Sequence, residues 1–256
     1  MHRMRILFVK RSGIVAVLAC LLIALTAVLY SVGNGDAPAA ALAAKKPVYS
    51  VDTKAKKVAV SFDAAWGADK TDGIMDILDS KGANATFFLV GFWVDKYPDK
   101  VKSIAERGFE IGNHSANHPR MTKLTQEQME LELAAVNDKI KELTGTAPTV
   151  FRPPFGDYND AVVQTVNDMS MHCIQWSIDS LDWKEFGVQD MIDRTVKKVK
   201  AGDIILFHNN SKYILDALPA ILDSLIKQGY QIVSVSELIY TENYSVDNNG
   251  VQHKNG

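Results

Sequence analysis

Acidic, basic and imidazole side chains recur in this sequence directly after short apolar runs. The groups are Asp63 after 58–62, His114 and His118 after 110–112, Arg152 after 149–151, Asp179 and Asp182 after 172–178, and His208 after 203–207. Carboxylates and imidazoles are the side chains that most often act as general acids, general bases and metal ligands. A single such residue after a strand is usually a cap or a surface residue, but five such positions in one chain predict an active site.

One pair of these groups has a spacing that suits a metal ion. His114 and His118 are four residues apart, and on a helical turn that spacing directs both imidazoles to one point. The pair alone is weak evidence, because capping and hydrogen-bonded histidines are commoner. His172 lies before an apolar run, away from the other groups, and is expected to have a structural role.

The elements that would position these groups alternate along the chain. The β-rich runs are 58–62, 85–90, 110–112, 149–151, 172–178, 203–207 and 231–235, and the helical patterns are 72–81, 98–107, 125–143, 160–169, 188–200 and 214–228. Thr125 and Gln128 predict a capping box for the longest helix. Alternation of this kind predicts a parallel sheet with crossover helices, in which chemistry collects at the carboxyl ends of the strands. An open doubly wound sheet and a barrel both fit the pattern.

Composition narrows the possible ligands. The formal net charge is −2, which does not favour nucleic acid, and the chain has no glycine-rich phosphate loop, which counts against nucleotide binding. Of the two cysteines, Cys20 lies in an apolar leader, so no disulfide framework is expected in the folded domain. Cys173 is expected to be a buried thiol.

The N-terminus predicts export. A basic flank precedes an almost unbroken apolar run that is long for a signal peptide and suits a membrane span, so the folded domain is expected outside the cytoplasm. A cleaved signal peptide is the alternative, with Ala41-Leu42-Ala43 as its cleavage site. The predicted segments are a cytoplasmic flank at 1–13, an anchor or signal segment at 14–32, a linker at 33–50, an α/β domain at 51–240 and a polar, frayed tail at 241–256.

The ordered motifs resemble those of the NodB-homology polysaccharide deacetylases, a carbohydrate esterase family. They are SFDAAWG at 61–67, ATFFLVG at 85–91, HSANH at 114–118, RPPFG at 152–156, DSLDW at 179–183 and LFH at 206–208. The variant form of the first motif, together with the leader and the small size, looks most like the PdaB-type deacetylases of spore-forming bacteria. That resemblance implies a role in sporulation.

The resemblance implies a fold, an activity and a set of roles. The fold would be a distorted (β/α)7 barrel, and the activity metal-dependent removal of N-acetyl groups from a cell-wall glycan, with N-acetylglucosamine, N-acetylmuramic acid or a chitin-like oligomer as substrate. A monomer attached to the membrane by its N-terminal segment is expected. By position, the resemblance makes Asp63 the general base, held ionised by Arg152, and His208 the general acid beside Asp182. His114 and His118 would be the ligands of zinc or cobalt. Trp183 and Leu206 would form the walls of the acetyl pocket, and one side of the sugar groove would consist of Pro153, Pro154 and Phe155.

Ala64 departs from the family pattern. The family has a second aspartate at this position, which ligates the metal, and an alanine cannot coordinate an ion. Two neutral imidazoles bind a divalent ion more weakly than a set that includes a carboxylate. Three outcomes stay open: a metal that keeps an extra water, Asp63 acting as ligand as well as base, or a metal-poor and silent site. A catalytically silent glycan-binding or scaffolding barrel, or a different metal-dependent hydrolase on the same barrel, are therefore alternatives to the deacetylase.

Overall fold

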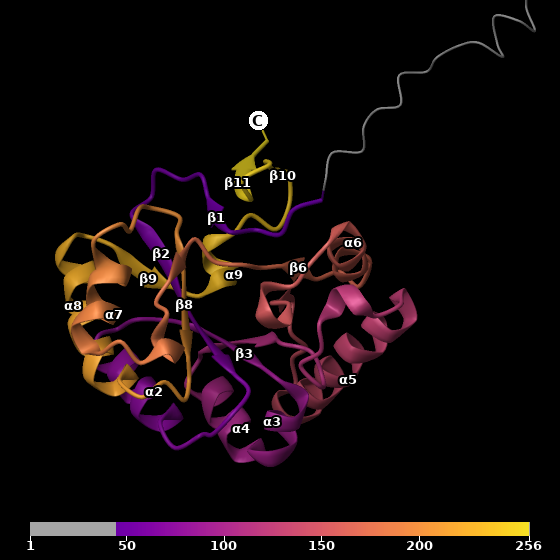
Figure 1. The fold of residues 1–256 in the computed structure, drawn as a ribbon, viewed down its shortest axis with the longest axis horizontal. Helices are drawn as coiled ribbons and strands as arrows, with labels where there is room; N and C mark the ends of the chain where they lie inside the picture. Colours follow the sequence, from indigo (N-terminus) through magenta and orange to yellow (C-terminus); the bar gives the residue numbers. More distant parts are fainter. Residues whose placement is uncertain (1–44, 256) are drawn as a thin grey trace, which may run out of the picture. The chain divides into compact units, whose positions relative to one another are not determined.

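A curled parallel sheet forms the centre of the domain (Figure 1). The computed structural model describes residues 45–255. The strands of the sheet follow the order β6-β5-β4-β3-β2-β8-β7, with β9 also paired to β2, and every pairing is parallel. The strands are β2 (Lys57–Ala64), β3 (Thr86–Leu89), β4 (Glu110–Asn113), β5 (Val150–Phe151), β6 (His172–Cys173), β7 (Ile178–Asp179), β8 (Ile204–His208) and β9 (Gln231–Val233). The expected distorted barrel is confirmed as a curled half-barrel.

One predicted strand is wrong in detail. The run 172–178 was expected to be continuous, but it forms β6 and β7 at the two ends of the sheet order, with no ladder joining them in the described part of the chain. Between them, Ile174 makes an isolated bridge to Val48, and the amide of Gln175 donates to the carbonyl oxygen of Val48 at 2.7 Å. An N-terminal segment therefore takes the hydrogen bonds that a continuous strand would have used.

Most of the helices surround the sheet on its outer side, whereas α9 packs on the inner face, where Val235 and Leu238 join the cluster of Ala59 and Phe88 (Figure 1). They are α2 (Thr71–Ser80), α3 (Gly91–Lys96), α4 (Pro98–Glu106), α5 (Gln126–Thr144), α6 (Asp160–Asp168), α7 (Val188–Val196), α8 (Ile214–Lys227) and α9 (Val235–Leu238). The capping box predicted for α5 is confirmed, because the Thr125 side chain accepts from the Gln128 amide while the Gln128 side chain accepts from the Thr125 amide. The sequence missed α3, whose six residues are too few to show a helical period.

The core fixes β2 at the centre of the domain. The ring of Phe62 stacks on Phe87 of β3 at 5.1 Å and on Phe207 of β8 at 5.6 Å between centroids. Val58 and Val60 lie in the same cluster as helices α2 and α8, whereas Ala59 belongs to a second cluster. Residues of β2 thus alternate between two buried faces, as expected for a strand covered on both sides.

The C-terminal residues form ordered structure and not the expected frayed tail. Strands β10 (Tyr244–Val246) and β11 (Val251–Lys254) make an antiparallel hairpin, and β11 also pairs in parallel with β1 (Ser50–Val51). The polar residues between them are turn residues: an Asp247 carboxylate oxygen accepts from the amides of Asn249 and Val251, and Gly250 has a φ of 79°.

The folded unit also begins earlier than predicted. Val48 was assigned to the linker at 33–50, but its side chain is 3% exposed and packs with Ile174. The predicted flank at 1–13, the apolar segment at 14–32 and the cleavage site Ala41-Leu42-Ala43 lie outside the described residues. Across residues 45–255, no helix combines the length and apolar character that a membrane crossing needs.

The hairpin is expected to contribute to stability through Gln252. This side chain is fully buried, accepts from the Tyr240 amide at 2.8 Å and donates to the Tyr240 carbonyl at 2.7 Å. Gln252→Ala leaves both backbone groups unpaired and should lower the free energy of unfolding by about 1–3 kcal/mol, measured by chemical denaturation. The control Gln231→Ala removes an exposed glutamine and should change it by less than about 0.5 kcal/mol. Equal stability of the two variants would show that the hairpin is not part of the cooperative fold.

Candidate active site

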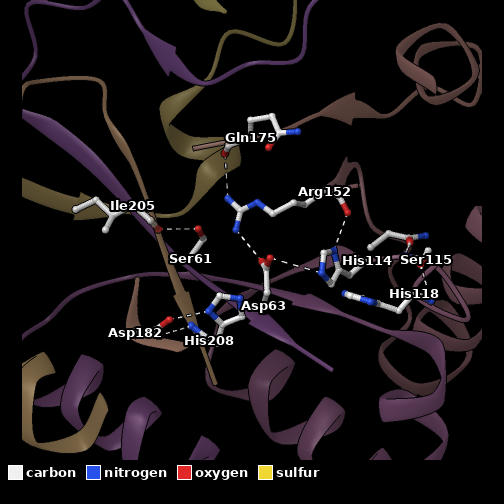
Figure 2. A network of polar contacts seen from close by, with 11 residues as sticks. Ser61, Asp63, His114, Ser115, His118, Arg152, Gln175, Asp182, Ile205 and His208 are labelled. Carbon is white, nitrogen blue, oxygen red and sulfur yellow. Dashed lines mark hydrogen bonds and ion pairs between the residues drawn. The ribbon is translucent and has the colours of Figure 1, made fainter. Parts of the chain in front are cut away.

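The carboxyl ends of the strands bring the predicted side chains together. Asp63 is the second-last residue of β2 and lies in register with His208, the last residue of β8. His114 follows β4 and Arg152 follows β5. These two strands pair with each other through Asn113 and Phe151. Figure 2 shows Asp63 between His208 on one side and His114 on the other. The strand-end pattern of the sequence thus corresponds to one site.

Asp63 is held by a buried guanidinium group. One Asp63 oxygen accepts from Arg152 Nη1 at 2.7 Å, and the other lies 3.5 Å from His114 Nε2. Burial alone would raise the pKa of Asp63, but the charge of Arg152, assisted by His114 and His208, outweighs it and holds the pKa below its usual range. Asp63 is therefore ionised at neutral pH and can accept a proton.

His208 is paired with a second carboxylate. Its Nδ1 lies 2.7 Å from one Asp182 oxygen, and its backbone amide donates to the other oxygen at 2.7 Å. Burial lowers the pKa of His208, but the hydrogen bond and charge of Asp182 exceed that effect, so the pKa lies above the usual value. The contact with Asp182 occupies Nδ1, and His208 itself lines the cavity, so Nε2 is the ring nitrogen left for a ligand.

His114 and His118 lie on the other side of Asp63. His114 Nδ1 donates to the Arg152 carbonyl oxygen at 2.7 Å, which leaves Nε2 as an acceptor facing Asp63. Burial lowers the pKa of His114, and burial together with the neighbouring His114 lowers the pKa of His118 to about 4. Both imidazoles are therefore neutral near pH 7, which is the form that ligates metals.

The two imidazoles suit a shared metal ion, although the third ligand is not preformed. Their ring centroids are 5.0 Å apart. Two imidazoles on one tetrahedral zinc ion, with Zn–N bonds of about 2.0–2.1 Å, would have centroids about 5 Å apart. Fixing one ring nitrogen by a backbone carbonyl, as in His114, is also typical of metal-bound histidines. Ala64 is buried among apolar side chains, and in the part of the chain that the structure describes no three His, Cys, Asp or Glu side chains form a complete metal cluster.

Asp63, His114, His118, Asp182 and His208 line a cavity of about 620 Å³. Of the predicted substrate-binding residues, Trp183, Leu206 and Phe155 line it. Pro153 and Pro154 were predicted to form one side of the groove, but they are buried behind it and are absent from its lining. They form the rigid turn before Phe155, which has a φ of 60° and is 59% exposed.

Several lining residues were missed as candidates from the sequence. They are Ala65, Trp66, Gly156, Trp176, Glu185, Asn210, Ser211 and Lys212. Trp66 lies within the first motif and the residues 210–212 follow directly after His208, so proximity along the chain to predicted groups was the signal available. The same signal was available for Glu185, two residues after Trp183, and for Trp176, three residues before Asp179. Asp179 also lines it, and its carboxylate accepts from the Leu181 amide at 2.8 Å.

Known proteins resemble this chain in sequence and in fold. A family model described as Polysaccharide deacetylase matches residues 50–174. A peptidoglycan-N-acetylglucosamine deacetylase from Bacillus cereus is 37% identical over 196 residues, which is 75% of this chain and 92% of the relative. The chain belongs to the polysaccharide deacetylase family.

Another member of this family is a peptidoglycan-N-acetylmuramic acid deacetylase, PdaA, from Bacillus subtilis. It is 31% identical over 75% of this chain and 74% of its own length. Among solved structures, a mutant of a family pseudoenzyme, described as having restored enzymatic activity, is similar with a TM-score of 0.73 and 33% identity over 75% of this chain and 70% of that one. The wild-type pseudoenzyme comes from Bacillus anthracis. The polysaccharide deacetylase family thus includes both named deacetylases and a pseudoenzyme among the relatives of this chain.

The buried ion pair predicts a stability defect that depends on pH. Arg152→Met leaves the Asp63 carboxylate buried without its cation and should cost about 3–5 kcal/mol of unfolding free energy at pH 7. Asp63 has a depressed pKa in the folded protein, so its stabilising contribution is present at neutral pH and is lost as the pH falls through that pKa. The deficit of the variant should therefore shrink in acid, where a protonated Asp63 needs no partner.

A matched control removes a surface ion pair. Arg107 contacts the exposed carboxylates of Asp76 and Asp79 at 2.7 and 2.8 Å, so Arg107→Met should cost at most about 1 kcal/mol, with no comparable relief in acid. Urea unfolding of both variants at a series of pH values measures this. A deficit of Arg152→Met that stays constant with pH would show that Asp63 is not the group left unpaired.

Proposed function

We propose that this protein is a metal-dependent hydrolase that removes N-acetyl groups from sugars of peptidoglycan. The observation that carries the proposal is the pairing within one cavity of an ionised carboxylate, Asp63, with an imidazole of raised pKa, His208. Hydrolysis of an amide needs a base for the attacking water and an acid for the leaving amine. A site that only binds a glycan needs neither group.

In this proposal Asp63 is the general base. Arg152 holds one of its oxygens and keeps the group ionised, and the other oxygen is available to take a proton from water. Because the pKa of Asp63 is below its usual range, the base is in its working form at neutral pH. Arg152 contacts the base and not the sugar, so its role is to position Asp63.

His208 is the general acid. Asp182 fixes its ring through Nδ1, so that Nε2 can deliver a proton to the amine nitrogen as the C–N bond breaks. The raised pKa keeps the imidazole protonated to a higher pH than usual. The rate should therefore fall as the pH rises through this pKa, and Asp182 is the group that sets where that fall occurs.

His114 and His118 are the proposed ligands of a divalent ion, zinc or cobalt. Such an ion would polarise the acetyl carbonyl oxygen and lower the pKa of a water molecule. The neutral form of both imidazoles and the spacing of their rings support this assignment. With Ala64 in place of the family carboxylate, Asp63 is the nearest acidic group that could complete the ligand set, since one of its oxygens lies 3.5 Å from His114 Nε2.

The substrate and the location are proposed from the relatives and the N-terminal sequence. One of the two relatives is a deacetylase of peptidoglycan N-acetylglucosamine and the other is a deacetylase of peptidoglycan N-acetylmuramic acid. Both sugars carry the acetamido group that the proposed base and acid would act on. We also propose that the N-terminal apolar segment, 14–32, attaches a monomeric enzyme to the outer face of the cell membrane and that the enzyme acts during sporulation.

A second candidate function is a glycan-binding barrel without turnover. Ala64 favours it, because the family's carboxylate ligand is absent and the similar solved structures include a pseudoenzyme. Retention of Asp63, Arg152, Asp182 and His208 favours catalysis. The two candidates differ in acetate release, which only the enzyme would show.

Acetate release from N-acetylated glycan tests the proposal. The purified full-length protein, supplied with zinc or cobalt, should release acetate from peptidoglycan fragments or chitooligosaccharides. His208→Ala should lower that rate by about 10²–10⁴-fold, because a general acid typically contributes that factor, while glycan binding is retained. Its backbone amide still donates to Asp182, so the local turn is preserved.

Two results would contradict the enzyme. His208→Ala retaining more than about a tenth of the wild-type rate would mean that another group is the acid. If wild-type protein binds a glycan but releases no acetate at any metal concentration, the glycan-binding barrel without turnover is the remaining candidate. Ala64→Asp is the matched variant for that case, and turnover in it alone would identify the missing carboxylate as the cause.

Metal affinity gives an independent prediction. The full-length protein should bind about one equivalent of zinc in equilibrium dialysis, and Ala64→Asp should tighten binding by about tenfold to a thousandfold, at about 1.4 kcal/mol per decade. His118→Ala should weaken binding, whereas His172→Ala, which alters a histidine 3.2 Å from the Tyr244 hydroxyl and away from the cavity, should not. Unchanged affinity in Ala64→Asp would mean that another group already fills the ligand position.

A further inference from the structure

The segment that carries His114 and His118 has an uncommon backbone conformation. Ser115 has a φ of 67° and His118 a φ of 54°, which is the left-handed region that favours glycine. Residues with a side chain keep such a conformation only where the surrounding structure fixes it. The contacts around the segment 114–118 therefore decide where the backbone places the His118 imidazole.

One set of these contacts comes from within the segment and from Asn113. The His118 amide donates to Ser115 Oγ at 3.0 Å, and the Ser115 amide donates to Asn113 Oδ1 at 2.8 Å. The buried Asn113 side chain in turn donates to the Leu133 carbonyl at 2.8 Å and to Asn137 Oδ1 at 2.9 Å. Leu133 and Asn137 belong to α5, so the first half of the segment is attached to that helix.

Helix α3 holds the middle of the segment. The amides of Gly91 and Phe92, the first two residues of α3, donate to the carbonyls of Ser115 at 2.9 Å and Ala116 at 3.3 Å. The two backbones approach closely, since a Cβ atom at Gly91 would lie only 2.9 Å from the Cα and the carbonyl oxygen of Ala116. The segment therefore has no freedom to move toward α3.

Asn117, the residue directly before His118, is held by a carboxylate of α5. One Glu132 oxygen accepts from the Asn117 backbone amide at 2.8 Å, and the other accepts from the Asn117 side-chain amide at 2.7 Å. Both oxygens of Glu132 thus bind one residue, through its backbone and its side chain. Glu132 does not itself line the cavity that holds the two imidazoles.

The two imidazoles differ in how their rings are fixed. His114 donates to the Arg152 carbonyl at 2.7 Å, which orients its ring directly. The ring of His118 packs edge-on against Trp66 at 5.3 Å and Phe155 at 4.5 Å between centroids. The position of the His118 ring therefore depends more strongly on the backbone that carries it.

We propose that Glu132 is a positioning residue for metal binding, because it fixes the backbone at Asn117 so that His118 faces the same point as His114. The inference rests on the proposed histidine ligands. Glu132 acts through Asn117 and is not itself a ligand. Loss of an outer contact that orients a metal ligand typically lowers metal affinity by about 10–100-fold.

Zinc affinity tests this inference without relying on turnover. The full-length wild-type protein is compared with Glu132→Ala, Glu132→Gln and Glu130→Ala by calorimetry with zinc. Glu130 is the matched control, because it lies on the same helix and accepts from Gln126 within that helix at 2.9 Å. Equal unfolding midpoints show that each variant is folded. If wild-type binding is too weak to measure, the same comparison is made in the Ala64→Asp protein.

The expected losses differ between the variants. Glu132→Ala should weaken zinc binding by about tenfold, and Glu130→Ala by less than about twofold. Glu132→Gln should lose less than about threefold, since its side-chain oxygen can still accept from the Asn117 amide. Both substitutions of Glu132 remove the same charge, so a difference between them assigns the effect to the hydrogen bonds.

A second background separates positioning from a general structural effect. In the His118→Ala protein, adding Glu132→Ala should change zinc affinity by less than about twofold, because the imidazole that Glu132 positions is gone. A general disturbance of the site would lower zinc affinity in both backgrounds.

Three results would overturn the inference: unchanged zinc affinity in Glu132→Ala, an equal loss in Glu132→Ala and Glu132→Gln, or a tenfold loss that persists without His118. No zinc binding by the wild type and by Ala64→Asp alike would overturn it together with the proposed ligands. Zinc binding without acetate release would instead count against the proposed enzyme and leave this inference intact.

Discussion

The buried guanidinium group of Arg152 holds the site together. Its side chain has no exposure to solvent, and moving such a charge out of water is costly unless it is paired. Asp63 supplies the opposite charge, the Gln175 carbonyl accepts a further hydrogen bond at 3.1 Å, and the Phe88 ring lies 4.2 Å from the guanidinium carbon. The backbone carbonyl of Arg152 accepts a hydrogen bond from His114 Nδ1 and so orients that imidazole. Arg152 therefore links the proposed base Asp63, the proposed metal ligand His114 and Gln175 in the segment after β6.

The environment sets different protonation states for groups that share one cavity. Arg152 keeps Asp63 ionised, Asp182 raises the pKa of His208 and so favours its protonated form, and burial keeps His114 and His118 neutral. Opposite shifts of this kind allow one site to hold a base and an acid at the same pH. Ala64 changes none of these arrangements directly, since its side chain packs in the apolar cluster beneath them. Ala64 therefore removes a possible metal ligand while the contacts of Asp63 with Arg152 and of His208 with Asp182 are kept.

The sequence predicted what depends on local pattern and missed what depends on distant partners. Apolar runs such as 58–62 and 203–207 predicted β2 and β8, because strands buried on both faces need no alternation of apolar and polar residues. The polar residues that follow these runs are Asp63 and His208. The split of 172–178 could not be foreseen, since Val48, far away in the chain, interrupts the ladder at Ile174. Pro153 and Pro154 were assigned to the groove from the family motif at 152–156, but they are buried and only Phe155 lines the cavity. The polar residues 247–250 resembled a frayed end, because β1, the strand that pairs with the following β11, lies about 200 residues earlier in the chain.

The pairing of β1 with β11 has a consequence for biosynthesis. Ser50 and Val51 are among the first residues of the folded domain to leave the ribosome, but their strand partners, Val251 and Gln252, are among the last. Until those residues emerge, β1 has no neighbour on that edge, and Tyr49 and Asp52 lack the hydrogen bonds they make with Gly250 and Gln252. The small sheet therefore closes only after residues 251–254 have been synthesised, so the domain stays incompletely folded until that point.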